Sequence, residues 1–394
     1  MAANIVLGVT GGIAAYKMLQ VASNLTKLNH NVYTIMTESA TKFINPLTFH
    51  SLTHLPVETD LFSSTSNEVK HIELADQADV FLIAPASANF LGKAAAGIAD
   101  DLLTTVILAS RAPIIVAPSM NVHMFENQIV QQNMTVLAER GYQIISPAAG
   151  YLACGYTGKG RLPEPELLVE AVLKELSKKD LTGKNILITA GPTREAIDPV
   201  RFISNNSSGK MGYALAKAAA YRGADVTLIS GPTALTPPVG VNYIAVKTAA
   251  EMKTEVDNNF SKSDITIMAA AVADYRPLQT NSEKLKKSTG NLKVELTRTT
   301  DILAEIAKNK RKDQLVVGFA AESQNLLANA QKKLEEKAAD FIIANDISLP
   351  DLGFGSNNNK ITILTGESKT TLPVQSKEKL AHKIFDYLID SGRK

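Results

Sequence analysis

The sequence contains a single cysteine, Cys154, and no tryptophan among its 394 residues. A lone thiol has no partner within the chain, which excludes an intrachain disulfide scaffold and zinc sites built on paired cysteines. Long apolar runs are missing as well: the first, residues 5–9, stops before Gly11 and Gly12, far short of the ~18 residues that a membrane-spanning helix needs. The chain also starts without the basic leader of a signal peptide. We therefore expect a cytoplasmic protein with no membrane partner.

Neither sign of charge dominates, because 41 Lys and Arg side chains are balanced by 39 Asp and Glu, for a net charge of +2. Residues 1–180 carry 12 basic and 16 acidic side chains, and the later residues carry 29 and 23. The modest positive balance of the second half suits an anionic small molecule. Aromatic and basic residues do not interleave as they do in single-strand-binding proteins. We expect small-molecule substrates and no nucleic-acid partner.

Short apolar runs alternate with longer helical patterns, and this series occurs twice along the chain. In the first series a helix is expected at 13–28 and strands at 4–10, 31–36, 80–84, 114–117 and 143–146. In the second, helices are expected at 166–179 and 208–221, and strands at 185–190, 225–230, 264–270, 315–318 and 340–344.

This order predicts an α/β protein made of two doubly wound domains in tandem, flavodoxin-like or Rossmann-like, each with a parallel sheet covered on both faces. The boundary is expected near residue 182, which gives domains 1–182 and 183–394. Candidate active loops, rich in glycine, proline or polar residues, are 148–163, 191–209, 274–292 and 350–359.

Three strand ends of the first half offer groups for a phosphate and the polar edge of a flat ring. A glycine turn follows the first strand, where bare backbone and the N–H groups of a helix start attract an anion. Hydroxyl and amide side chains follow two later strands, where helix capping is a compatible structural alternative. The predicted cofactor contacts are Gly11, Gly12, Ile13, Ala14, Thr37, Ser87 and Asn89.

Four motifs of the first half are specific enough to indicate a family. They are residues 71–74 (His-Ile-Glu-Leu), 85–89 (Pro-Ala-Ser-Ala-Asn), 118–124 (Pro-Ser-Met-Asn-Val-His-Met) and 153–155 (Ala-Cys-Gly). Together they resemble the flavin-dependent cysteine decarboxylases, a homo-oligomeric family in which FMN lies between subunits. The resemblance implies that FMN oxidises the substrate thiol, which provides an electron sink for loss of CO2, and then reduces the resulting enethiol.

The resemblance also implies three catalytic residues. His71 acts near the substrate thiol or carboxylate, Asn121 binds the carboxylate, and Cys154 donates a proton in the final reduction. Structural alternatives are a hydrogen-bonded core histidine, a helix cap at Asn121 and a small buried thiol. The loop of Cys154, residues 150–161, contains four glycines and two cations. Such an electropositive setting favours a reactive thiol.

The second half contains a long polar, glycine-rich stretch at 198–212 and three lysines within residues 284–287. Neither a Walker A sequence nor Gly-x-Gly-x-x-Gly occurs, so a P-loop ATPase is not supported. The lysines suit a triphosphate and its leaving pyrophosphate, and Asp274 upstream suits Mg2+. A solvated surface cluster is the structural alternative for the lysines.

These stretches, with 189–195 and 269–277, resemble phosphopantothenate–cysteine ligase, fused to the decarboxylase as in bacterial coenzyme A biosynthesis. The resemblance implies that the carboxylate of 4'-phosphopantothenate attacks CTP to give an acyl-cytidylate. The amine of L-cysteine then attacks its activated carbonyl. It implies trimer-based FMN domains and dimeric ligase domains. Asn205 and Arg201 bind substrate and Lys284 stabilises charge; the nucleotide contacts are Asp274, Lys284, Thr299, Thr300, Asp301, Ile302, Phe319, Lys333 and Lys337.

One departure concerns the turn at 299–302, where Thr300 stands at a position that is often proline in the family. Two other functions remain open. A flavin-binding regulatory or assembly subunit without activity is one, although Cys154, His71 and Asn121 are all present. A nicotinamide oxidoreductase is the other, disfavoured by the missing glycine fingerprint.

Overall fold

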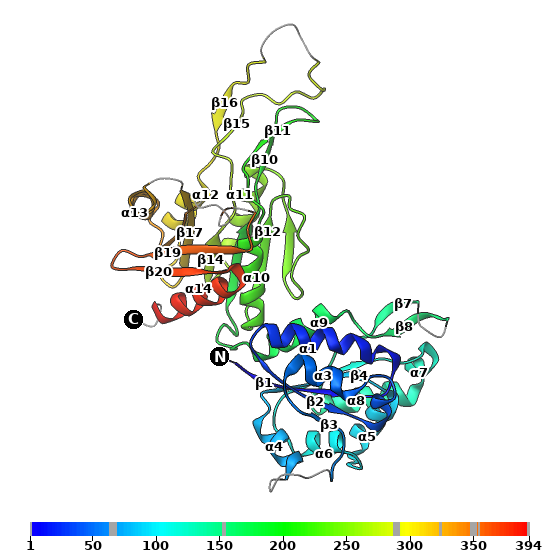
Figure 1. The fold of residues 1–394 in the computed structure, drawn as a ribbon. Coiled ribbons are helices and arrows are strands. Elements are labelled where there is room, and N and C mark those ends of the chain that lie inside the picture. Colours follow the sequence, from blue (N-terminus) through cyan, green and yellow to red (C-terminus); the bar gives the residue numbers. More distant parts are fainter. Residues whose placement is uncertain are drawn as a thin grey trace. The chain divides into compact units, whose positions relative to one another are not determined.

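The computed structural model describes residues 2–62, 69–151, 155–286, 292–322, 325–346, 353 and 355–391. The chain divides into two compact units, Met1–Ser177 and Lys178–Lys394 (Figure 1). Each unit is built on its own central sheet with helices on both faces, which confirms the predicted class of two doubly wound α/β domains. Among the described residues, no helix has the length and apolar character needed to cross a bilayer.

The first sheet is wholly parallel, with the strand order β3-β2-β1-β4-β5-β6. Its strands are β1 (Asn4–Val9), β2 (Asn31–Met36), β3 (Val57–Glu58), β4 (Val80–Ala86), β5 (Ile114–Pro118) and β6 (Gln143–Ile144), and β7 (Ala148–Tyr151) and β8 (Thr157–Arg161) form a separate hairpin. The helices are η1 (Ile13–Tyr16), α1 (Lys17–Lys27), α2 (Glu38–Thr41), α3 (Pro46–Thr53), α4 (Lys70–Gln77), α5 (Ala88–Ala96), α6 (Leu102–Ala109), α7 (Val122–Glu126), α8 (Gln128–Glu139) and α9 (Pro165–Leu176).

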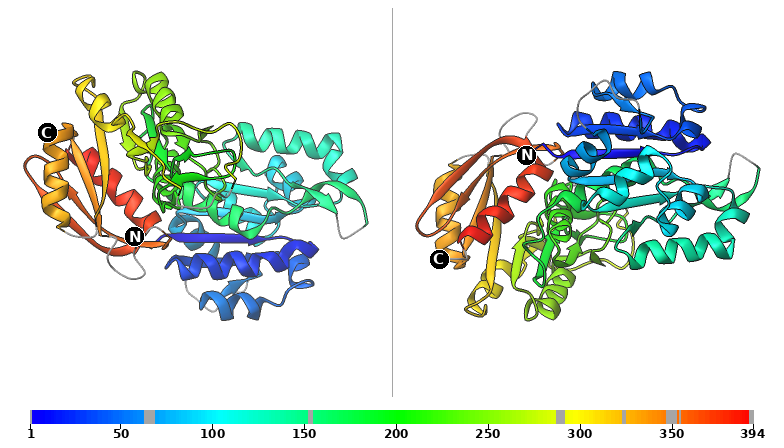
Figure 2. Two further views of the ribbon diagram at one scale, coloured as in Figure 1. Left: turned by 90° about the horizontal axis from the view of Figure 1, so that it is seen from above. Right: turned by 90° about the horizontal axis from the view of Figure 1, so that it is seen from below.

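The residues of β1 alternate between two cores, one on each face of this sheet. Helices cover both faces (Figure 2). Ile5 and Leu7 pack with α1 and α9, whereas Val6 packs with α4, α5 and α6. All three side chains are fully buried. A strand covered on both faces needs a continuous apolar run, which is why it was recognisable in the sequence.

The second sheet has the order β13-β12-β9-β14-β17-β18-β19-β20, in which β19 and β20 are antiparallel. Its strands are β9 (Asn185–Ala190), β12 (Asp225–Ser230), β13 (Asn242–Ala245), β14 (Ile265–Met268), β17 (Leu315–Glu322), β18 (Phe341–Asp346), β19 (Asn358–Leu364) and β20 (Lys369–Ser376). Two hairpins stand apart, β10 (Arg194–Ala196) with β11 (Phe202–Ser204), and β15 (Tyr275–Pro277) with β16 (Leu296–Arg298). The helices are α10 (Lys210–Tyr221), α11 (Ala249–Phe260), α12 (Ile302–Lys308), α13 (Leu326–Lys337) and α14 (Lys377–Ser391).

In each unit the first strand lies inside the sheet, and later strands are added first on one side of it and then on the other. The strand order reverses between β1 and β4 in the first unit and between β9 and β14 in the second. Doubly wound sheets bind ligands at the carboxyl ends of the strands at such switch points. The topology therefore directs attention to the loops after these four strands.

Several predicted elements have different bounds or pairing. The helix expected at 208–221 begins at Lys210, because Gly209 precedes it with a left-handed φ of 76°. The stretch 148–163, predicted as a loop, contains the β7–β8 hairpin, whose strands are held by backbone pairing and lack an apolar pattern. The antiparallel strands β19 and β20 were not predicted. β20 is largely exposed, so it lacks the buried run of the parallel strands.

Candidate functional sites

At the switch point of the first sheet, Thr10 joins the end of β1 to the end of β4. Its hydroxyl donates a hydrogen bond to the carbonyl of Pro85 at 2.7 Å and accepts one from the N–H of Ser87 at 2.9 Å. The side chain is buried. Thr10 was not predicted as a site residue, although it stands directly before the glycine turn that was.

Gly11 and Gly12 form the turn into η1, and Gly11 lies close to α2, the helix after β2. A side-chain carbon placed on Gly11 would lie 2.5 Å from Cβ of Ser39. Ala14 is half-buried and Ile13 is 61% exposed. The N–H groups of a first helical turn have no partner within the helix, so this bare backbone suits a phosphate. The site thus fits the phosphate group of a flavin mononucleotide.

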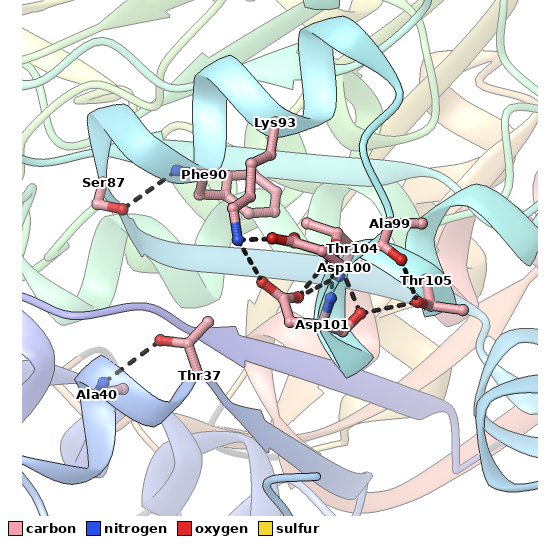
Figure 3. A network of polar contacts seen from close by, with 10 residues as sticks. All are labelled: Thr37, Ala40, Ser87, Phe90, Lys93, Ala99, Asp100, Asp101, Thr104 and Thr105. Atoms are coloured by element: carbon pink, nitrogen blue, oxygen red, sulfur yellow. Dashed lines mark hydrogen bonds and ion pairs between the residues drawn. The ribbon is translucent and has the colours of Figure 1, made fainter. Parts of the chain in front are cut away.

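Two predicted hydroxyls cap the helices after β2 and β4 (Figure 3). Thr37 accepts from the N–H of Ala40, and Ser87 accepts from the N–H of Phe90, each at 3.3 Å. The capping alternative is therefore realised, and it remains compatible with ligand binding because a hydroxyl that accepts one bond still carries a proton to donate. Asn89 is exposed in the first turn of α5.

A lysine holds the turn that follows α5. Nζ of Lys93 lies 2.7 Å from a carboxylate oxygen of Asp100 and 3.2 Å from one of Asp101 (Figure 3). Asp101 also caps α6 through Thr104. The hydrogen bond to Asp100 is the largest cause that raises the pKa of Lys93, so its ammonium is retained at neutral pH.

Asn121 stands at the start of α7, where its side-chain oxygen accepts from the N–H of His123 at 2.8 Å. The β7–β8 hairpin packs on the same segment. The N–H of Met120 donates to the carbonyl of Gly160 at 3.0 Å, and a carbon placed on Gly158 would lie 2.6 Å from Val122. Cys154 lies outside the described residues.

His71 lies in the first turn of α4 and is half-buried. Its neighbour Lys70 forms ion pairs with Glu58 at 3.4 Å and Glu73 at 3.1 Å. Within the part of the chain that the structure describes, no recorded hydrogen bond or ion pair joins His71 to Asn121 or to the glycine turn.

At the switch point of the second sheet opens a cavity of about 1130 Å³. Its walls are the segment before α10, the segment after β14, the turn before α12, the end of β17 and one side of α13. The structure brings together here the predicted residues Asn205, Asp274, Thr299, Thr300, Asp301, Ile302, Phe319, Lys333 and Lys337.

Two lysines, one helical turn apart on α13, supply positive charge to this cavity. Nζ of Lys333 donates to the carbonyl of Phe319 at 2.8 Å, and Lys337 forms an ion pair with Asp301. Burial favours the neutral form of Asp301, but Lys337 and the N–H of Ala304 outweigh it and hold the pKa of this carboxyl below its usual value. Asp301 is therefore charged and fixes Lys337 at the cavity wall.

Asn205 and Asp274 lie on adjoining walls. The amide of Asn205 donates to the carbonyls of Ala271 at 3.2 Å and Val272 at 3.1 Å. Asp274 is exposed, and among the described residues no group of three or more His, Cys, Asp or Glu side chains gathers as metal ligands. A single carboxylate nevertheless fits Mg2+, which proteins usually bind through one or two carboxylates together with substrate phosphates.

Arg201 and Lys284 are not among the described residues that line this cavity. The guanidinium of Arg201 is bonded to Asp198 and to the carbonyl of Leu285, each at 2.6 Å. Lys284, directly before Leu285, is exposed. Three other lysines line the cavity and were not predicted as site residues: Lys210 lies within the polar stretch 198–212, Lys332 directly precedes Lys333 on α13, and no motif pointed to Lys377.

The two units together define a two-domain flavoprotein. Residues 2–177 match the family model described as Flavoprotein, and residues 181–391 match that of the DNA/pantothenate metabolism flavoprotein C-terminal domain. The chain is 49% identical over 388 residues to the coenzyme A biosynthesis bifunctional protein CoaBC of Bacillus subtilis, covering 97% of this chain and 95% of that protein. The chain belongs to this CoaBC family, which confirms the resemblance seen in the sequence.

Two other proteins are similar to this chain. The CoaBC protein of Vibrio cholerae is 46% identical over 384 residues, covering 97% of this chain and 96% of that protein. A crystal structure of the C-terminal domain of a CoaBC protein is 44% identical, covers 53% of this chain and 95% of that chain, and has a TM-score of 0.46.

Proposed function

We propose that this chain catalyses two consecutive reactions of coenzyme A biosynthesis. The second unit joins L-cysteine to 4'-phosphopantothenate with CTP, and the first decarboxylates the product, 4'-phospho-N-pantothenoylcysteine, to 4'-phosphopantetheine. The observation that carries this proposal is that each unit presents its own set of polar groups at the switch point of its own sheet. Membership of a bifunctional family supports it along nearly the full length.

In the decarboxylase unit, the turn of Gly11, Gly12, Ile13 and Ala14 would hold the FMN phosphate, with Thr37, Ser87 and Asn89 beside the ring. FMN held there would supply the acceptor for two electrons from the substrate thiol, and the source of the same two electrons once CO2 has left. Asn121 orients the substrate carboxylate from the start of α7, where its side chain is fixed by His123. His71 acts on the thiol or carboxylate, and Cys154 supplies the last proton.

In the ligase unit, Lys333 and Lys337 attract the nucleotide from one face of α13, and Asp274 would hold Mg2+ with the phosphates. Asn205 binds the acyl-cytidylate, the turn from Thr299 to Ile302 and Phe319 contact the nucleotide, Arg201 serves the substrate side, and Lys284 stabilises charge as pyrophosphate leaves. The active protein is a cytoplasmic homo-oligomer with trimer-based FMN domains and dimeric ligase domains.

The purified chain tests the first activity. It should be yellow with bound FMN and should release CO2 from 4'-phospho-N-pantothenoylcysteine. A protein that binds flavin yet releases no CO2 would instead support the regulatory or assembly function, and a protein that takes up no FMN would contradict both.

The ligase is tested by pyrophosphate release, which should require CTP, L-cysteine and 4'-phosphopantothenate together. Parallel rates with ATP decide the nucleotide preference. Lys284→Gln should impair this reaction and leave the decarboxylase of the same chain intact. Equal loss of both activities would mean that the two units do not act independently.

A further inference from the structure

The tripeptide Gly-Pro-Thr occurs twice, at residues 191–193 after β9 and at residues 231–233 after β12. These strands are parallel neighbours, with Ser230 paired to Ala190. The two turns consequently lie side by side at the carboxyl edge of the second sheet. In each turn the threonine contacts a segment that forms a wall of the ligase cavity.

Thr193 holds the segment that leads to Asp274. Its side chain is fully buried, and its hydroxyl oxygen accepts a hydrogen bond from the N–H of Ala273 at 3.0 Å. The backbone N–H of Thr193 donates to the carbonyl of Ala271 at 3.3 Å. The carbonyl of Ala273 accepts from the hydroxyl of Thr299 at 2.6 Å. The backbone directly before Asp274 is thus fixed by two threonine side chains, Thr193 after β9 and Thr299 after β16.

Thr233 holds the opposite wall through its methyl group. A carbon placed on Gly209 would lie 2.7 Å from Cγ2 of Thr233, and one placed on Gly191 would lie 2.9 Å from the same atom. Both glycines have left-handed φ angles, 76° and 73°. The methyl group therefore fills the space that the two glycines leave, and Gly209 is the residue from which α10 starts.

The hydroxyl of Thr233 anchors this methyl group. It donates to the phenol oxygen of Tyr213 at 3.1 Å, and that phenol donates to the hydroxyl of Ser230 at 3.3 Å. Tyr213 is a buried residue of α10. Thr233 is thus tied both to the helix that follows Gly209 and to the strand end that carries its own turn.

We infer that Thr193 and Thr233 are positioning residues of the ligase: Thr193 sets the direction of Asp274, and Thr233 sets the turn at Gly209. Neither is among the described residues that line the ligase cavity, although Thr233 lines a second pocket that shares residues 205–208 and Lys210 with it. In this inference each threonine acts through the backbone that it holds. The inference rests on the proposed ligase function. It assigns Thr193 to the wall that carries Asp274, where a displacement would lower kcat. It assigns Thr233 to the start of α10, where a displacement would raise KM for the anionic nucleotide.

Thr193→Val keeps the shape of the side chain and removes the acceptor for Ala273. Ligase kcat should fall about tenfold or more, because a small displacement of a reacting group is costly. Thr193→Ser keeps the hydroxyl and should therefore retain most of the parental kcat. Thr233→Ser removes the methyl group and should raise KM for CTP about fivefold with kcat little changed, whereas Thr233→Val keeps the methyl group and should hold KM within about twofold of the parent.

All four variants are measured in the full chain, with thermal unfolding and decarboxylase activity recorded alongside. A parent chain without CTP-dependent ligase activity would refute the proposed function itself. With an active parent, unchanged kcat in Thr193→Val together with unchanged KM in Thr233→Ser would overturn the inference. So would equal losses in the Val and Ser variants of Thr193, or losses that disappear at a temperature where the variants are fully folded. If Thr193→Val does not fold, the KM values of Thr233→Ser and Thr233→Val for CTP test the inference.

Discussion

Asp198 and Arg201 form an ion pair whose atoms approach to 2.6 Å and which also holds the backbone of Leu285. The carboxylate is fully buried and accepts from the N–H groups of Val200 and Arg201, each at 2.8 Å, and from that of Leu285 at 3.1 Å. Burial favours the protonated acid, but these bonds and the guanidinium outweigh it and hold the pKa of Asp198 far below its usual range. The pair therefore connects the stretch 198–201 to the residue that follows Lys284.

Asp198→Asn should release Leu285 and with it the position of Lys284. We expect ligase kcat/KM to fall about 10- to 100-fold, because a misplaced charge no longer meets the transition state. Decarboxylase activity of the same chain should be unchanged. Asp313→Asn is the matched control, since its ion pair with Arg311 is solvent-exposed and should be silent. A fully active Asp198→Asn chain would show that Lys284 needs no such anchor.

Gly160→Ala should separate the β7–β8 hairpin from the segment of Asn121. The added carbon would collide with the carbonyl of Met120, and Gly160 has a φ of 143° that alanine rarely adopts. We expect a cost above about 1 kcal/mol and a fall in decarboxylase kcat with the ligase unaffected. Gly92→Ala, within α5, is the control, because its added carbon would lie 3.7 Å from the side-chain nitrogen of Asn133, at ordinary contact distance. Normal decarboxylation by Gly160→Ala would mean that the hairpin contact is dispensable.

Cys154→Ser should still release CO2 but stop before the final protonation, because a serine hydroxyl is a much weaker acid than a thiol. The expected product is the enethiol, identified by mass spectrometry, in place of 4'-phosphopantetheine. Ligase rates serve as the internal control. Formation of 4'-phosphopantetheine at the parental rate would remove the role assigned to Cys154.

The affinity for CTP should weaken as the pH rises through 8. Burial, aided by the charge of Lys210, lowers the pKa of Lys377 to about 8, and both lysines line the ligase cavity. Below this pH Lys377 is cationic and attracts the triphosphate; above it the charge is lost, and KM should rise by at most about tenfold per pH unit for one linked proton.

Lys377→Arg keeps its charge across this range and should flatten the profile measured from about pH 7 to about pH 9.5. Decarboxylase rates of the same samples separate this effect from general alkaline inactivation. A flat profile in the parent chain, or the same rise in Lys377→Arg, would contradict the assignment.

Much of the site was predictable where its residues are close in sequence. Asn205 lies within the polar stretch before α10, and Asp274 lies in the segment between the buried strand β14 and β15, so a pattern pointed to each. Lys377 had no such signal, because it starts α14, 40 residues beyond Lys337, the nearest residue predicted for this site. The partner of Arg201 was likewise hidden: Leu285 contributes only backbone atoms to that contact, and backbone groups leave no trace in residue type.

The order of apolar runs and helical patterns determined two doubly wound domains and the buried parallel strands of their sheets, since residues of a strand buried on both faces must be apolar throughout. The glycine turns and the polar residues after the strands could likewise be recognised from short stretches of the sequence. The tertiary structure decided which strand ends become neighbours, and so which distant side chains meet. The contact of Thr233 with Gly209 and of Thr193 with Ala273 exists only because β9 pairs with both β12 and β14. Pairing of strands far apart in the chain depends on packing of the whole domain, which no local pattern encodes.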